Sequence, residues 1–106
     1  MSSQASRFEL FFPGFIVIIL TMSGQSLKIS RILHAGYIFE CGHTQIIFDP
    51  IFENPFSHNC YAFPNVRFDH EQIRKLRPAA VFISHFHDDH CSFESLELLD
   101  RRTPIY

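Results

Sequence analysis

The sequence predicts a mixed α/β (α+β) fold, and three observations lead to this class. Residues 27–48 contain three short strand-like runs separated by glycine-containing connectors, which is typical of an antiparallel meander. Residues 69–100 alternate helix signals with the signal of a buried strand. The chain has 106 residues, of which 46% are hydrophobic, so it can form one small domain or half of a larger one.

An apolar run, FFPGFIVIIL, sets the first 21 residues apart. This run is shorter than the stretch of about 20 apolar residues that crosses a bilayer. We interpret residues 1–21 as an apolar extension upstream of a natural initiator at Met22, and residues 22–106 as the domain. A signal peptide or membrane anchor is one alternative, and an additional strand or helix is another.

The meander is expected in three runs. They are LKISRIL (27–33), YIFEC (37–41) and TQIIFD (44–49), of which the first alternates apolar and polar residues with period two. The connectors HAG and CGH each contain a glycine, and we expect these glycines to supply the positive φ of tight turns. Residues 50–68 contain three prolines and are predicted to form a long ordered loop.

Helix signals flank a buried strand in the rest of the chain. Asp69 is placed to cap the first helix and Ser92 the second, while Pro78 ends the first. The predicted segments are a helix in DHEQIRKLRP (69–78), a strand in AAVFIS (79–84), a helix in SFESLELLD (92–100) and the start of a further strand in TPIY (103–106).

Composition narrows the function classes. The formal net charge of −2 and the absence of a basic cluster give no indication of binding to nucleic acid or to an anionic membrane. The three cysteines, Cys41, Cys60 and Cys91, have no CxxC spacing. The odd number of cysteines and the absence of a CxxC pair argue against a disulfide framework or a cysteine zinc site. They favour a reducing compartment, and therefore a cytoplasmic location.

The densest group of potential ligands is SHFHDDH, directly after the predicted buried strand. His85 and His87 are two residues apart, so in an extended segment both imidazoles project to one side, with Phe86 pointing into the protein. Asp89 and His90 follow at the turn into the helix and can face the same cleft. Imidazole and carboxylate suit zinc, and also iron or manganese. A solvated histidine-rich turn is the weaker alternative.

SHFHDDH resembles the HxHxDH signature of the metallo-β-lactamase-fold superfamily, including its place between an apolar strand and a helix. The upstream segment RILHAGYIFECGHTQIIFDP is similar to the opening hairpin of that fold. Its form resembles the branch of ascorbate-phosphate lactonase, the N-acyl-ethanolamine phospholipase D enzymes and the sialic-acid hydroxylases. The resemblance covers residues 27–106. It implies the N-terminal half of an αββα sandwich, with a mostly antiparallel mixed sheet and helices on one face.

The resemblance implies two divalent metal ions, with zinc expected and iron or manganese as alternatives. His85 and His87 would bind the first ion. Asp89 and His90 would bind the second, and Asp89 would also act catalytically by taking a proton.

Two further residues have implied roles beside the ions. Asp49 would orient a ligand histidine without touching the metal, and a turn aspartate at the end of a strand is the alternative. His34 would lie near the cleft, where a structural turn histidine is the alternative.

The implied function is a metal-dependent hydrolase, in which a metal-bound hydroxide attacks an ester, lactone, amide or phosphodiester of a small-molecule substrate. A di-iron oxygenase with the same ligands is the alternative. The superfamily takes its remaining ligands from a second half that is missing here. We therefore expect this chain alone to be an inactive truncated piece with weak metal affinity, and to expose an apolar sheet face that the other half would cover.

Overall fold

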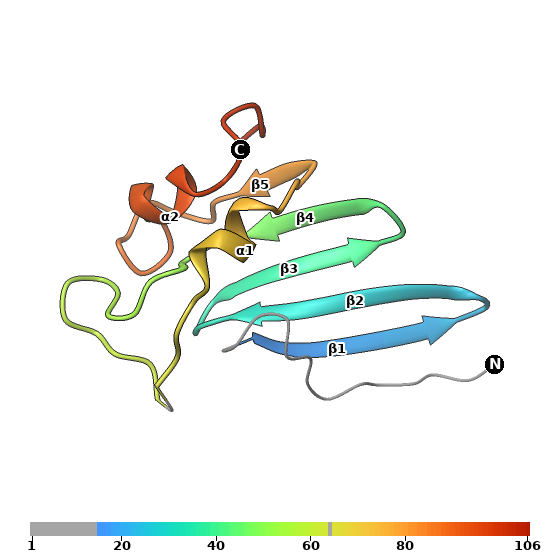
Figure 1. The fold of residues 1–106 in the computed structure, drawn as a ribbon, viewed down its shortest axis with the longest axis horizontal. Coiled ribbons are helices and arrows are strands. Elements are labelled where there is room, and N and C mark those ends of the chain that lie inside the picture. Colours follow the sequence, from blue (N-terminus) through green and yellow to red (C-terminus); the bar gives the residue numbers. More distant parts are fainter. Residues whose placement is uncertain (1–14, 64) are drawn as a thin grey trace.

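Five strands form one sheet in the computed structural model, which describes residues 15–63 and 65–106 (Figure 1). The elements are β1 (Phe15–Met22), β2 (Gln25–Ile32), β3 (Gly36–Cys41), β4 (Thr44–Phe48), α1 (His70–Arg74), β5 (Ala80–Phe82) and α2 (Phe93–Glu97). The strands lie in the order in which they occur in the chain. β1 to β4 are antiparallel, and β5 joins β4 in parallel. The predicted fold class, a mostly antiparallel mixed sheet, is confirmed.

β1 lies in the segment that we interpreted from the sequence as an extension. It pairs with β2 along its whole length, from Phe15 opposite Ile32 to Met22 opposite Gln25. Residues 15–21 are thus strand residues of the sheet, which corresponds to the alternative of an additional strand. The rest of the predicted extension lies outside the described residues, and the division of the chain after residue 21 stays a prediction.

The predicted meander is confirmed as β2, β3 and β4, but its two connector glycines have different roles. Gly42 has the expected positive φ, 59°. At the other connector Leu33, not Gly36, has the positive φ, 49°. A Cβ added at Gly36 would lie 2.6 Å from the backbone oxygen of Asp49. The missing side chain of Gly36 therefore lets the chain after β4 pass close to the start of β3.

The core covers one face of the sheet, because alternate side chains of a strand point to opposite faces. It consists of Ile32, Ile38, Ile47 and Val81 from β2 to β5, Phe52 from the following loop, Ile73 and Leu76 from the α1 segment, and Leu99 after α2. Both helices pack on this face, as predicted, and Figure 1 shows α1 in front of the sheet near β3 and β4.

The other face of the sheet carries a row of aromatic rings. Successive ring centroids lie 5.0 to 6.0 Å apart in the order Tyr37, Phe39, Phe48, Phe82 and Tyr106. Tyr37 and Phe48 are each 37% exposed. The sheet therefore has the expected accessible apolar face. That a second half of the domain covers this face stays a prediction.

The helix and strand starts at the C-terminal end also match the sequence. The Asp69 carboxylate accepts hydrogen bonds from two backbone N–H groups of α1, and the Ser92 hydroxyl accepts one from Ser95 of α2. Ile105 pairs in parallel with Val81 of β5, at the predicted start of a strand. Neither α1 nor α2 has the length and hydrophobicity needed to cross a membrane, and no other helix occurs in residues 15–63 or 65–106.

Candidate metal centre

The HxHxDH turn lies at the carboxyl ends of β4 and β5. These strands are parallel, so the residues that follow them meet at the same edge of the sheet. The ring centroids of His85 and His87 are 4.8 Å apart, and those of His85 and His90 are 4.1 Å apart. The turn is closed by the carbonyl of His87, which accepts hydrogen bonds from the backbone N–H groups of His90 and Cys91. The three histidines are thus gathered within one turn.

Asp49, directly after β4, lies beneath this turn and is only 7% exposed. Its Oδ2 accepts hydrogen bonds from Nδ1 of His90 at 2.8 Å and from the Ser84 hydroxyl at 2.6 Å, and its Oδ1 accepts one from the Ser84 backbone at 2.7 Å. The carboxylate thereby places the proton of His90 on Nδ1 and leaves Nε2 available as a ligand atom. The role of Asp49 in orienting a ligand histidine stays a prediction, and Ser84, which the sequence did not single out, completes its contacts.

The pKa of Asp49 reflects two opposing effects. Burial raises the pKa, but the hydrogen bonds from Ser84 and His90 outweigh burial and hold the pKa of the carboxyl group below its ordinary value. Asp49 therefore stays ionised in neutral solution, as an acceptor for the His90 proton.

Two groups of three side chains bring potential ligand atoms within 4.8 Å of one another. One is His85, His87 and Asp89, and the other is His34, Asp89 and His90. Nitrogen and oxygen ligands lie about 2.0–2.2 Å from zinc in a tetrahedral arrangement, so two ligand atoms on one ion are about 3.3–3.6 Å apart. Side-chain movements of about 1 Å bring the atoms of either group to that separation. The donor set of both groups therefore fits a divalent metal ion.

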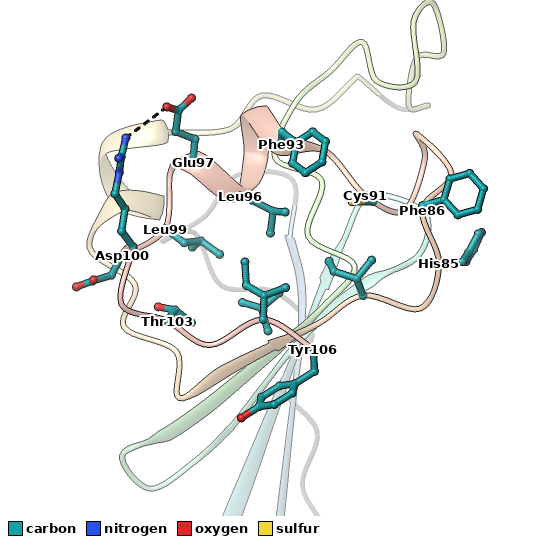
Figure 2. A pocket seen from close by; sticks show the side chains of 14 residues that line it. His85, Phe86, Cys91, Phe93, Leu96, Glu97, Leu99, Asp100, Thr103 and Tyr106 are labelled. Carbon is teal, nitrogen blue, oxygen red and sulfur yellow. Dashed lines mark ion pairs between the residues drawn. The ribbon is translucent and has the colours of Figure 1, made fainter.

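Phe86 lies differently from the prediction. It is 83% exposed and points away from the protein, and Figure 2 shows it beside His85 at the rim of a groove. β5 ends at Phe82, so residues 85 and 86 lie in an irregular segment between this strand and the turn at 88–90. The ring centroids of His85 and His87 still lie 4.8 Å apart.

His34 lies in the turn between β2 and β3. Its ring stacks on Phe56, with centroids 4.5 Å apart and planes at 14°, and its centroid lies 5.7 Å from that of His90. Both ring nitrogens are buried, and neither has a hydrogen-bond partner among the described residues. The structure thus places His34 in one of the two groups of potential ligands, while its role beside a metal ion stays a prediction.

The long loop after β4 adds a contact that the sequence did not predict. Nε2 of His58 lies 2.9 Å from a carboxylate oxygen of Asp88 in the HxHxDH turn. The two side chains are 85% and 62% exposed, so the pair is solvated. Asp88 is therefore a surface carboxylate, and His58 has a partner that its position in the sequence does not reveal.

An apolar groove of about 830 Å³ borders the turn (Figure 2). His85 and Phe86 lie at one end, Leu96 and Leu99 line its wall, and Tyr106 lies on the opposite side. His85 belongs both to this groove and to a ligand group. The groove is of a size that suits a small molecule, and it opens beside the candidate metal centre.

One solved structure similar to this chain is that of a protein from Parabacteroides distasonis named as a metal-dependent hydrolase. The two structures superpose with a TM-score of 0.56 at 22% sequence identity, over 98% of this chain and 36% of the neighbour. The chain thus spans about a third of the neighbour's length, and the likeness shows a shared fold. No protein-family model matches the sequence, and no curated protein matches it.

Proposed function

We propose that this chain carries the metal-binding turn of a metal-dependent hydrolase of the metallo-β-lactamase superfamily. The observation that carries the proposal is that one turn, above the buried carboxylate of Asp49, supplies four potential ligand side chains to two groups that could hold a metal ion. These side chains are His85, His87, Asp89 and His90. The neighbour named as a metal-dependent hydrolase supports the proposal through its fold. The opening-hairpin resemblance supports the branch of ascorbate-phosphate lactonase and the N-acyl-ethanolamine phospholipase D enzymes.

Each side chain has a stated role in this proposal. His85 and His87 hold one ion, and Asp89 and His90 hold a second, with zinc as the expected metal. A bound divalent ion supplies Lewis acidity and lowers the pKa of a water molecule toward neutrality. Asp49 keeps the imidazole of His90 in the tautomer that presents Nε2. Asp89, whose side chain is 42% exposed, takes the proton that hydrolysis releases.

The proposed reaction is hydrolysis of an ester, lactone, amide or phosphodiester in a small molecule. In each of these, negative charge develops on an oxygen atom, and a cationic site stabilises that charge. Because the chain spans 36% of its structural neighbour, the activity is proposed for the protein in which the metal ligands are complete. The four side chains supply two ligands per ion, whereas catalytic zinc sites use three. We therefore expect the 106 residues alone to bind metal and to hydrolyse little.

Isothermal titration of Zn²⁺ into the metal-free chain tests the proposal. We expect binding to the wild-type chain, and a loss of binding at one site in the His85→Ala/His87→Ala double variant. His43→Ala is the matched control, because His43 is an exposed histidine in the turn between β3 and β4. A wild-type chain that binds no zinc, or a double variant that binds like the wild type, contradicts the proposal. Iron in the purified protein with oxygen-dependent turnover would favour the oxygenase alternative.

A further inference from the structure

We infer that His34 is itself a metal ligand, and supplies the third protein ligand to the ion held by Asp89 and His90. This inference rests on the proposed function, since it presupposes that the turn binds a divalent ion. It differs from a role near the cleft, because it requires direct contact between a ring nitrogen of His34 and the metal.

The first observation is the state of the His34 ring nitrogens. Both are buried, and the residues that the structure describes offer neither of them a hydrogen bond. A buried polar atom without a partner loses its hydration without compensation, so folded proteins rarely keep one without a reason. A metal ion would be a partner for such a nitrogen. The potential ligands Asp89 and His90 lie close enough to the His34 ring to share an ion with it.

The distances fit coordination better than hydrogen bonding. Nε2 of His34 lies 3.9 Å from Oδ2 of Asp89, and Nε2 of His90 lies 3.6 Å from the same oxygen. Both separations are too long for a hydrogen bond. Both are close to the separation of about 3.3–3.6 Å between two ligand atoms of a tetrahedral zinc ion. An ion between the three side chains would therefore contact all of them after small movements.

The ring of His34 is also held in place. Phe56 of the long loop stacks on one face of the ring at 14°, and the backbone carbonyl of His34 accepts a hydrogen bond from the Arg31 side chain at 3.0 Å. Neither contact uses a ring nitrogen. An imidazole that is positioned through its face and its backbone, with its nitrogens left over, is arranged as a ligand and not as a hydrogen-bonding turn residue.

The consequence is one ion with three protein ligands from within this chain. Asp89 and His90 come from the turn after β5, and His34 comes from the turn between β2 and β3. Three is the number of protein ligands in catalytic zinc sites, which keep a fourth position for water. The ion would also tie together two turns that are far apart in the sequence.

His34→Phe is the test variant, because phenylalanine keeps the stack on Phe56 and removes both ring nitrogens. His43→Phe is the matched control at an exposed turn histidine. Titration of Co²⁺ and of Zn²⁺ into each metal-free chain, followed by absorbance and by calorimetry, measures the affinity of the tighter site. We expect His34→Phe to weaken that site at least about tenfold and to change the cobalt spectrum, and His43→Phe to leave both unchanged.

The same variants separate the possible failures. A wild-type chain that binds neither ion overturns this inference together with the proposed function. A wild-type chain that binds metal, with His34→Phe binding as tightly and with the same cobalt spectrum, overturns only the role of His34. Circular dichroism and urea unfolding without metal check the fold of the variant. We expect its urea midpoint to equal or exceed that of the wild type, because two unpartnered nitrogens are removed.

Imidazole nitrogen NMR gives a second readout that does not depend on a stable variant. The ring resonances of His34 in the wild-type chain are assigned through residue-specific backbone connectivity. Saturating Zn²⁺ should shift one ring nitrogen of His34 as strongly as the ligating nitrogen of His90. A His34 nitrogen that does not respond, while that of His90 does, overturns the inference.

Discussion

At the residue scale, Asp49 links the strand order to the chemistry of the turn. It follows β4, adopts a positive φ of 44°, and reaches both Ser84 and His90 with one carboxylate. Aspartate tolerates this backbone conformation better than most residues. A short side chain with two acceptor oxygens at the end of β4 can therefore bind both Ser84 and His90.

Asp49→Asn should weaken metal binding. The amide is neutral and can present an N–H group to His90, so the carboxylate no longer holds the Nδ1 proton of the imidazole. We expect a loss of about 10–100-fold in Zn²⁺ affinity, the range found for groups that orient ligand histidines. Calorimetric titration of the metal-free chain measures it. An affinity equal to that of the wild type would show that Asp49 does not orient His90.

The lowered pKa of Asp49 predicts a pH dependence of the metal-free chain. A carboxyl group whose pKa is lower in the folded than in the unfolded state stabilises the fold above its ordinary pKa of about 4. That contribution is lost as the pH falls through the folded-state pKa. Urea midpoints between pH 7 and pH 3 should therefore fall more steeply for the wild type than for Asp49→Asn. If the urea midpoints of the two proteins fell equally with pH, Asp49 would not be the group responsible for the pH dependence.

Gly36→Ala should destabilise the fold by contact and not by backbone strain. The added Cβ would meet the backbone oxygen of Asp49 at 2.6 Å, and a backbone atom cannot move aside as a flexible side chain can. We expect a loss of about 1–3 kcal/mol in the free energy of unfolding. Gly24→Ala is the comparison, since its Cβ meets nothing within 4 Å but its φ is 76°. Urea unfolding of both variants should show the larger loss at Gly36.

At the element scale, α2 depends on the loop that precedes α1. The hydroxyl of Ser95, which is 1% exposed, accepts a hydrogen bond from the Phe52 backbone at 2.8 Å and donates one to Glu53 at 2.8 Å. Ser92, the cap of the same helix, also donates to Glu53. A helix of five residues is too short to be stable alone, so these contacts hold it on the sheet.

Ser95→Ala should destabilise the protein by about 1–3 kcal/mol, because the buried Phe52 N–H group loses its acceptor. Urea unfolding monitored by circular dichroism measures the loss. Glu94→Ala, at an exposed position of α2, is the control and should change the free energy of unfolding by less than about 0.5 kcal/mol. Equal effects of the two substitutions would rule out the buried hydrogen bond as the cause.

At the scale of the whole molecule, the two faces of the sheet differ. One face is covered by α1, α2 and the long loop, and the other presents the aromatic row from Tyr37 to Tyr106. Accessible aromatic side chains in a continuous row favour association with another apolar surface. We expect the isolated chain to self-associate through this face.

Phe48→Thr should reduce that association. Phe48 is 37% exposed in the middle of the row, between Phe39 and Phe82, and threonine keeps the tendency to form a strand. Sedimentation velocity over a concentration series should show a shift toward monomer. Asn59→Thr, at an exposed loop position, is the control. A monomeric wild-type chain would contradict the prediction.

Features that depend on neighbouring residues could be predicted from the amino-acid sequence. The meander, the caps Asp69 and Ser92, and the gathering of potential ligands in SHFHDDH follow from period, turn chemistry and spacing over a few positions. The orientation of Phe86 was predicted wrongly, because it depended on where β5 ends.

Contacts between distant segments, in contrast, depend on how the strands are arranged in space. The hydrogen bond from His90 to Asp49, the close approach of Gly36 to Asp49, and the position of His34 beside Asp89 each join residues from different strands or turns. No local pattern encodes such a contact. They arise because β5 pairs in parallel with β4 while β2 and β3 run antiparallel beside them, which brings three separate turns to one edge of the sheet.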